Sequence, residues 1–309
     1  MFCSTIIPTV NRPSLVRAVS SVLQQDFPKD QFEVIVVNDS GQPLTKADWQ
    51  QSAQVRVIET NRRNRSVARN AGAAIAKGTY LHFLDDDDCM MPGAFAAFWE
   101  LSCHSQAAWL HGAFQFVDDS GEFLRDVTLN LTGNCFVQIM VGEWIPIQAS
   151  FIQAVPFFSV GGFAPLSSLL GGSEDIDLSR MICHDFAMAF TPTPVATIRR
   201  GIESSTTDYS NLFDQLRQSR EKGLSLPGSF SRMRFSAREA GEGSAYWNGY
   251  IVYLYLVSTF HNLFRQRRFF TALSRGFYAV AAFFLAGTDL FKLSFWRGIR
   301  EKYISPSFI

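Results

Sequence analysis

Short apolar runs alternate with helical patterns over the first hundred residues. Strand-like runs fall at 4–8, 32–37, 55–58 and 80–84, and the run at 32–37 is of the continuous apolar type that is buried on both faces of a parallel sheet. Between them, apolar residues recur at helical spacing over 14–25 and 66–77. This strand–helix–strand order predicts an α/β fold with a mostly parallel central sheet flanked by helices.

The regular alternation ends after Pro92. The pattern there predicts a helix at 94–101 and a β-hairpin of 108–117 with 122–129. Double glycines at 161–162 and 171–172 bracket a loop that we expect to face the ligand, and a helix is predicted to begin at Glu174. Beyond about residue 200 the chain is first polar and then aromatic and helical. We therefore expect a domain of residues 1–200 and a helical extension of residues 201–309.

The 28 basic and 28 acidic residues cancel over the whole chain but not within its parts. Residues 261–309 hold eight basic and two acidic residues, a net charge of +6, so residues 1–260 carry −6. The same tail holds nine of the 29 phenylalanines. The overall balance argues against a nucleic-acid partner, and the basic, aromatic tail predicts peripheral contact with an anionic membrane.

Apolar residues recur every four positions near the end of the chain, at Phe291, Phe295, Ile299 and Tyr303. This spacing predicts an amphipathic helix over 289–303, suited to a membrane interface. The alternative is that the aromatic stripe packs against the rest of the chain or in a homodimer.

The targeting signals and the cysteines bear on the compartment. We find no signal-peptide pattern, no apolar run of the ~20 residues that span a bilayer, and no C-x-x-C pair among five widely spaced cysteines. These observations predict a cytoplasmic protein, and the basic, aromatic tail adds the cytoplasmic face of the membrane as its peripheral site.

Four consecutive aspartates, residues 85–88, follow directly after the strand predicted at 80–84. Adjacent carboxylates repel one another, and a hard divalent cation such as Mg²⁺ or Mn²⁺ removes that cost. Such a metal would also neutralise the charge of a departing diphosphate. The alternative is a solvated acidic turn, although a turn seldom needs four acids behind an apolar strand.

Further polar residues follow the first two strands, where ligands of parallel sheets bind. Thr9, Asn11 and Arg12 follow the first strand, and Asp39 follows the second. A carboxylate in that position can accept a hydrogen bond from a uracil N3–H or a ribose hydroxyl. The alternative is that these side chains only stabilise turns or cap a helix.

Two further clusters fall at predicted helix starts. Arg65 and Arg69 are four residues apart and suit phosphate oxygens. The alternative is a solvated helix face, with Arg69 packed against the helix. Glu174 and Asp175 open a later helix, where acids are stabilised by the helix dipole. Capping is the plain interpretation, but an inverting transfer also needs one carboxylate base at such a place.

Together these motifs resemble those of family 2 glycosyltransferases with the GT-A fold. The matching stretches are STIIPTVNRP (4–13), FEVIVVNDSG (32–41), RSVARNAGAAIAKGTYLHFLDDDDCMMPGA (65–94) and GGSEDIDLSRMI (171–182). The resemblance implies a GT-A nucleotide-diphospho-sugar transferase fold over roughly residues 3–200. It also implies metal-dependent, inverting transfer from a nucleoside-diphosphate sugar to a saccharide or lipid-linked acceptor, in polysaccharide or glycoconjugate synthesis. Asp39 favours a UDP-sugar.

The resemblance also implies which residues hold the nucleotide. Thr9, Asn11 and Asp39 stand where the family holds the base and the ribose. Arg65 or Arg69 stands where a basic side chain approaches the nucleotide.

The family's DxD motif and its catalytic base have counterparts as well. Asp85, Asp86 and Asp87 cover the DxD motif, with Asp87 as the metal ligand and the other two toward ribose, phosphate or the metal, Mn²⁺ or Mg²⁺. Four aspartates in a row leave this register open by one residue. Asp175, second in the Glu-Asp pair, matches the catalytic base.

Two other functions remain as alternatives. A nucleotidyltransferase with a similar sheet would be expected to carry a glycine-rich basic loop after the first strand, where IPTVNRP has no glycine. A non-catalytic glycan- or membrane-binding homologue is disfavoured by the acidic loop and by Asp175.

Overall fold

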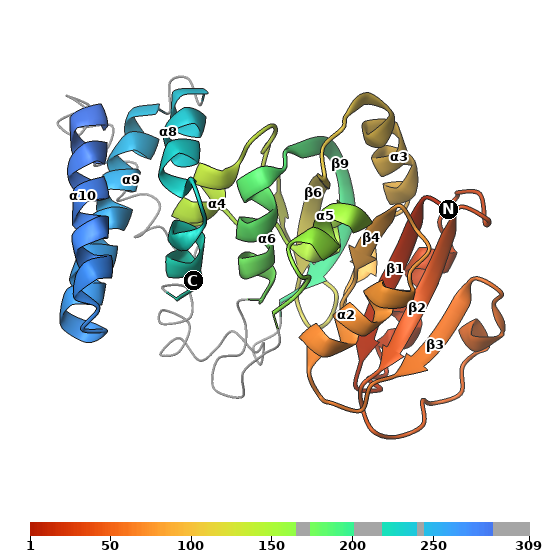
Figure 1. The fold of residues 1–309 in the computed structure, drawn as a ribbon. Helices are drawn as coiled ribbons and strands as arrows, with labels where there is room; N and C mark the ends of the chain where they lie inside the picture. The colour runs from red at the N-terminus through yellow and green to blue at the C-terminus, as the bar shows by residue number, and fades with distance from the viewer. Residues whose placement is uncertain (165–173, 201–217, 240–243, 287–309) are drawn as a thin grey trace. The chain divides into compact units, whose positions relative to one another are not determined.

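The computed structural model describes residues 1–164, 174–200, 218–239 and 244–286 (Figure 1). The chain divides into two compact units. The first comprises Met1–Asn134 and Trp144–Ser219, and the second comprises Cys135–Glu143 and Arg220–Ile309. The short segment Cys135–Glu143 thus belongs with the C-terminal part of the chain. How function divides between the two parts stays a prediction.

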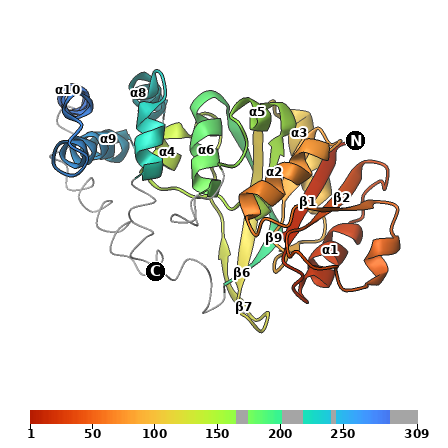
Figure 2. The ribbon, with the colours of Figure 1, turned by 60° about the horizontal axis from the view of Figure 1, so that its bottom comes forward.

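The first unit is built on a mixed sheet, nine-stranded within the described residues, in the order β3-β2-β1-β4-β8-β6-β9-β5, with β7 beside β6 (Figures 1 and 2). The strands are β1 (Cys3–Thr9), β2 (Phe32–Asn38), β3 (Val55–Glu59), β4 (Tyr80–Phe83), β5 (Cys89–Met90), β6 (Trp109–Val117), β7 (Phe123–Val127), β8 (Ser150–Gln153) and β9 (Met188–Arg199).

The α/β class is confirmed, and the parallel part of the sheet is its N-terminal half. Strands β1 to β4 pair in parallel, as the alternation of strands and helices predicts. Beyond them β8 runs antiparallel to both β4 and β6, β5 runs antiparallel to β9, and β6 and β7 form the predicted hairpin. Only β6 and β9 are parallel in this later half of the described sheet. The sheet is therefore mixed, because the strands after β4 are no longer joined by regular helical crossovers.

Helices cover both faces of the sheet. The helices are α1 (Leu15–Leu23), α2 (Arg65–Ile75), α3 (Ala94–His104), α5 (Ala154–Ser159) and α6 (Glu174–Asp185). The first and third pack in one core with inward residues of β1 and β2, and α2 lies on the opposite face. On α2, a Cβ at Gly72 would lie 2.5 Å from Cγ2 of Ile6, so glycine allows the helix to approach the sheet closely.

The N-terminus of α2 is capped by Asn64, whose side chain accepts hydrogen bonds from the backbone N–H groups of Ser66 and Val67. Its C-terminus comes earlier than the sequence predicts. The helix ends at Ile75, and Gly78 instead lies against β1, where a Cβ would be 2.4 Å from the backbone nitrogen of Ser4.

The second unit is helical over its described residues. It contains α4 (Phe136–Val141), α8 (Ser229–Glu239), α9 (Ser244–Phe260), a π-helical turn (His261–Arg265) and α10 (Phe269–Ala286). Buried Arg275 of α10 donates hydrogen bonds to the carbonyl of Leu224 and the hydroxyl of Ser225. Within the described part of the chain, no helix has both the length and the hydropathy that a membrane span requires. The amphipathic helix expected at 289–303 lies outside the described residues.

Candidate active site

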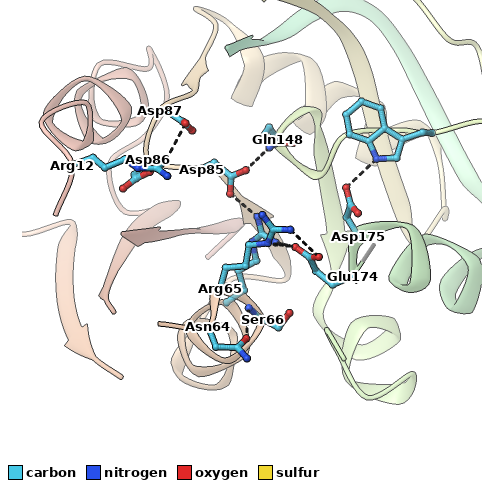
Figure 3. A network of polar contacts seen from close by, with 12 residues as sticks. Arg12, Asn64, Arg65, Ser66, Asp85, Asp86, Asp87, Gln148, Glu174 and Asp175 are labelled. Carbon is cyan, nitrogen blue, oxygen red and sulfur yellow. Dashed lines mark hydrogen bonds and ion pairs between the residues drawn. The ribbon is translucent and has the colours of Figure 1, made fainter. Parts of the chain in front are cut away.

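Polar residues after β1 and β4 meet at the carboxyl edge of the sheet, because these two strands are parallel neighbours. The Thr9 hydroxyl donates a 2.6 Å hydrogen bond to Oδ2 of Asp86 and accepts one from the backbone N–H of Asn11. The Arg12 guanidinium lies 3.1 Å from Oδ1 of Asp86 and 3.0 Å from Oδ2 of Asp87 (Figure 3). The loop after β1 is thus tied to the acidic loop after β4.

Asn11 also holds a second loop. Its φ is 69°, a left-handed conformation that asparagine tolerates better than most residues. Its side-chain oxygen accepts a hydrogen bond from the backbone N–H of Thr45, and its amide donates to the carbonyl of Pro43. Asn11 therefore fixes the loop after β2 against the loop after β1.

A buried ion-pair network joins α2, the acidic loop and the start of α6 (Figure 3). The Arg69 side chain is 3% exposed, with Nη2 2.5 Å from Oδ1 of Asp85 and Nη1 3.0 Å from Oε1 of Glu174. One turn earlier on α2, Arg65 pairs with Glu174 as well. The Gln148 side-chain amide donates a 2.7 Å hydrogen bond to Oδ2 of Asp85. Two arginines and two carboxylates thus hold three segments together.

The charges of this network sustain one another. Burial alone would lower the pKa of Arg69, but Asp85 and Glu174 outweigh it and raise that pKa. Burial alone would raise the pKa of Asp85, but Arg69 outweighs it and lowers that pKa. Both groups therefore stay ionised, and their attraction acts where little water screens it.

This arrangement changes the picture of the two arginines and of Glu174. The approach of Arg65 or Arg69 to the nucleotide stays a prediction; in the structure both engage the carboxylate of Glu174. Helix capping is the plain interpretation of Glu174 from the sequence, yet its side chain is 4% exposed and anchors α6 to α2. The spacing of the arginines on one helix face is the one sequence signal for such a shared partner.

Asp175 is the second carboxylate at the start of α6. Its Oδ2 accepts a 3.0 Å hydrogen bond from Nε1 of Trp144, and its Oδ1 accepts one from the backbone N–H of Ile176. Burial, helped by the negative charge of Glu174, raises the pKa of Asp175 to about 6, against the opposing effect of Trp144. A carboxylate tuned in this way ionises just below neutral pH and then accepts a proton more readily than an ordinary aspartate.

Asp39 organises the basic loop that precedes α2. Its carboxylate accepts hydrogen bonds from the Thr60 hydroxyl at 2.7 Å and from the backbone N–H groups of Arg62 and Asn64 at 2.6 and 2.5 Å. Since a carboxylate has about four acceptor positions, these contacts leave capacity for one more hydrogen bond at Oδ2. Its assignment to the base or the ribose stays a prediction.

A buried histidine positions Gln148. The ring of His82 contacts the Thr5 hydroxyl through Nδ1 and the backbone carbonyl of Gln148 through Nε2, at 3.2 and 3.0 Å. Burial lowers the pKa of His82 to about 4, so the ring is neutral at physiological pH. The histidine thus has a structural role, because it holds the segment whose side chain bonds Asp85.

The first of the two expected glycine pairs lies where a loop is pinned to α2. Asn70 makes two hydrogen bonds with the backbone of Phe163, one to its carbonyl and one from its N–H. Gly162, at φ 67°, has no room for a side chain, because a Cβ would lie 2.7 Å from Oδ1 of Asn70. The second pair, 171–172, lies outside the described residues.

The acidic loop after β4 is a candidate metal site. Among the residues that the structure describes, no three His, Cys, Asp or Glu side chains are arranged to hold a metal ion by themselves. Mg²⁺ is commonly bound by one or two carboxylates together with substrate phosphates and water. The Asp87 side chain is 38% exposed, against 31% for Asp85 and 6% for Asp86. The donor set therefore fits a metal that arrives with a diphosphate.

The electrostatics of Asp87 agree with that fit. Burial and the charge of Asp85 raise the pKa of Asp87, and Arg12 offsets this only in part. The negative charge of the acidic loop thus exceeds the positive charge that Arg12 supplies. Asp88 does not share this exposure, because it is buried and accepts a hydrogen bond from the backbone N–H of Arg199.

Comparison with known proteins gives one family. The family model described as "Glycosyl transferase family 2" matches residues 4–159. The chain is 42% identical over 91 residues to an uncharacterized glycosyltransferase of Haemophilus influenzae, which covers 29% of this chain and 30% of that protein. It is 34% identical over 93 residues to the poly(ribitol-phosphate) beta-N-acetylglucosaminyltransferase TarP of Staphylococcus aureus, covering 28% of each. The chain thus spans less than a third of the length of these relatives.

Solved structures share the fold. Residues 1–349 of TarS from S. aureus, in complex with UDP-GlcNAc, match with a TM-score of 0.58 over 94% of this chain and 82% of that one, at 17% identity. A complex of the same fragment with UDP gives a TM-score of 0.54 at 16% identity. At such identities the likeness shows the GT-A fold alone, which confirms the fold expected from the motifs.

Proposed function

Because the chain belongs to glycosyl transferase family 2, we propose that it transfers a sugar from a nucleoside-diphosphate sugar to an acceptor hydroxyl, with inversion at the anomeric carbon. One observation carries the proposal: a part-buried carboxylate with a pKa of about 6, Asp175, follows directly on Glu174, which an ion-pair network links to the acidic loop. Such an arrangement combines a base for the acceptor with an acidic loop for the diphosphate (Figure 3).

The donor would bind at the carboxyl edge of the sheet. We place the base and the ribose beside Thr9, Asn11 and Asp39, with Asp86 behind them. The remaining acceptor capacity of Asp39 favours a UDP-sugar, since uracil offers an N3–H donor. The UDP-GlcNAc and UDP bound to the structurally similar TarS fragment support the same choice.

Mg²⁺ or Mn²⁺ would be held by Asp87 together with Asp85, and would neutralise the negative charge of the departing nucleoside diphosphate. In the structure Asp85 is engaged by Arg69 and Gln148, whereas Asp87 contacts the half-exposed Arg12. Asp87 is accordingly the better placed of the two to bind a ligand that enters from solvent.

The chemical step rests on Asp175. Its ionised carboxylate takes the proton of the acceptor hydroxyl as the acceptor oxygen forms a bond to the anomeric carbon and the bond to the diphosphate oxygen breaks. Trp144 holds Oδ2 through its N–H, and Glu174 holds the start of α6 through Arg65 and Arg69. A single displacement of this kind needs no covalent intermediate.

The acceptor would be a saccharide or a lipid-linked saccharide in the synthesis of an envelope polysaccharide or glycoconjugate. The names of TarP and TarS, which describe transfer to poly(ribitol-phosphate), support a surface polymer as the acceptor class. We also propose peripheral membrane contact through residues 261–309, with a homodimer as the alternative use of the same region.

A donor panel tests the proposed activity. The chain is incubated with UDP-, GDP-, CDP- and dTDP-sugars, in Mn²⁺, in Mg²⁺ and in EDTA, and the released nucleoside diphosphate is measured. We expect metal-dependent release from a UDP-sugar, and loss of transfer but retained donor binding in Asp175→Asn. Failure of every donor to bind or react would refute the proposed glycosyltransferase activity. Pyrophosphate release from a nucleoside triphosphate would instead indicate a nucleotidyltransferase.

A further inference from the structure

Helix α10 has its large apolar side chains on the outside. The side of α10 that is buried carries small residues, Ala272, Ala279 and Ala282. Gly276 lies against Thr259 of α9, with space for ordinary van der Waals contact. The exposed side of α10 instead carries a stripe of large residues at helical spacing: Phe269, Phe270, Leu273, Phe277, Val280 and Phe284. This is the reverse of a surface helix in a water-exposed protein, which buries its large apolar residues.

The stripe continues onto α9 and the turn. The exposed residues there are Tyr253, Leu256, Val257, Phe260, Leu263 and Phe264. We call these residues and the α10 stripe the outer face. Six of its phenylalanines are between 58% and 85% exposed, which amounts to roughly 800 Å² of aromatic surface. The largest apolar patch of a typical monomer is about 300–600 Å², so an area of this size indicates a binding partner.

The charge of the same segment identifies the kind of partner. Residues 244–286 contain four arginines and no aspartate, glutamate or lysine. Arg275 is buried, but Arg265, Arg267 and Arg268 are exposed at the turn, between Phe264 and Phe269. Glu221, outside this segment, accepts a hydrogen bond from Asn262 and lies 3.8 Å from Arg275, but the segment has no acid of its own. Aromatic side chains flanked by exposed arginines suit the boundary between acyl chains and anionic headgroups.

We propose that the outer face docks on an anionic membrane surface, with the phenylalanines in the acyl boundary and the three arginines of the turn at lipid phosphates. Self-association of the same face fits the charges less well, because residues 244–286 of a second copy would offer no carboxylate to the arginines of the turn. The inference deepens the proposed membrane contact, on which it rests. It shifts the contact toward residues 253–284 and does not depend on sugar transfer.

Flotation of the full chain with vesicles tests the proposal, in the absence of any donor. We expect binding to vesicles that contain phosphatidylglycerol, weaker binding to pure phosphatidylcholine, and a decline as salt is raised. The double variant Phe270→Ser/Phe277→Ser should lose more than about tenfold in binding. Arg267→Gln/Arg268→Gln should lose about tenfold on anionic vesicles and little on neutral ones.

Matched variants in the first unit serve as controls. Phe123→Ser/Phe158→Ser removes two phenylalanines that are 57% and 50% exposed, and it should bind vesicles like the unaltered chain. Arg62→Gln/Arg63→Gln removes an exposed arginine pair elsewhere and should also bind normally. Thermal melting checks that each variant folds.

Three results would overturn the proposal. One is equal binding of neutral and anionic vesicles. Another is unchanged binding in Phe270→Ser/Phe277→Ser. The third is a chain that does not bind vesicles but forms a dimer, with Phe270→Ser/Phe277→Ser remaining a monomer. A donor panel that fails while vesicle binding follows the expected pattern would count against sugar transfer alone.

Discussion

Replacing Trp144 with phenylalanine tests whether Asp175 is the group whose ionisation controls the reaction. The change keeps an aromatic ring but removes the N–H that lies 3.0 Å from Oδ2 of Asp175. Because that hydrogen bond stabilises the ionised carboxylate, its loss should raise the pKa of Asp175 further above its usual range.

The size of the shift follows from the strength of the bond. A hydrogen bond to a charged group contributes about 1.5–3 kcal/mol, and 1.36 kcal/mol corresponds to one pKa unit, so a rise of about 1–2 units is expected. Since the base acts in its ionised form, activity rises with pH through the pKa of Asp175, which is about 6 in the unaltered protein. In Trp144→Phe this rise should move to about pH 7–8.

The assay is the pH dependence of kcat/KM for release of the nucleoside diphosphate, since this parameter reports the ionisation of the free enzyme. Glu174→Gln provides a variant with the opposite expectation. The negative charge of Glu174 raises the pKa of Asp175, so its removal should move the acidic limb of the profile, where kcat/KM rises with pH, to lower pH. Asp185→Asn, at the far end of the same helix and half exposed, should leave the limb in place.

If the acidic limb moves in the same direction in Trp144→Phe and Glu174→Gln, or moves in neither, a group other than Asp175 controls the pH dependence of kcat/KM. Loss of activity in Glu174→Gln at every pH would not replace this test, because the variant also removes the carboxylate that Arg65 and Arg69 share. Breaking such a buried pair costs about 3–5 kcal/mol of unfolding free energy. Chemical denaturation therefore accompanies the rate measurements, and Trp144→Phe carries the decision.

Three further outcomes follow from the same structure. Asp175→Asn should raise the free energy of unfolding by up to about 3 kcal/mol above pH 6 and leave it unchanged below pH 4. The reason is that folding raises the pKa of Asp175 from 3.8 to about 6, so the unaltered protein loses stability as pH rises through that range. Urea denaturation at several pH values measures this difference. Gly162→Ala should cost about 1–3 kcal/mol in the same assay, whereas Gly161→Ala, also at positive φ but with nothing within 4 Å of the new Cβ, should cost less. Asp87→Asn should abolish the strengthening of donor binding by Mn²⁺ while leaving metal-free binding within about twofold, as calorimetry with and without EDTA would show.

Local patterns predict the first half of the catalytic fold. Apolar runs joined by helical patterns define β1 to β4, α1 and α2, because parallel strands need crossovers of this kind. The later strands depend on contacts that a local pattern does not contain. β8, for example, is a four-residue strand that lies between β4 and β6, which precede it in the chain.

The site divides along the same line. The acidic loop and Asp175 are visible in the sequence because their spacing is local. The partners of Glu174 are not, since Arg65 and Arg69 lie more than 100 residues away along the chain. Trp144 and Gln148 fall in an irregular segment without periodicity, so no pattern marks them until the fold brings them to Asp175 and Asp85.

The two adjacent acids of α6, Glu174 and Asp175, have different roles. Glu174 is surrounded by arginines, and its charge is matched by theirs. Asp175, one residue on, has a tryptophan N–H and a backbone N–H as its hydrogen-bond partners, so burial dominates and raises its pKa. The first acid holds the helix in place, and the second is left short of stabilisation, which makes it a stronger base. If the proposed reaction is correct, the ion-pair network of Glu174 offsets the stability that Asp175 costs above pH 6.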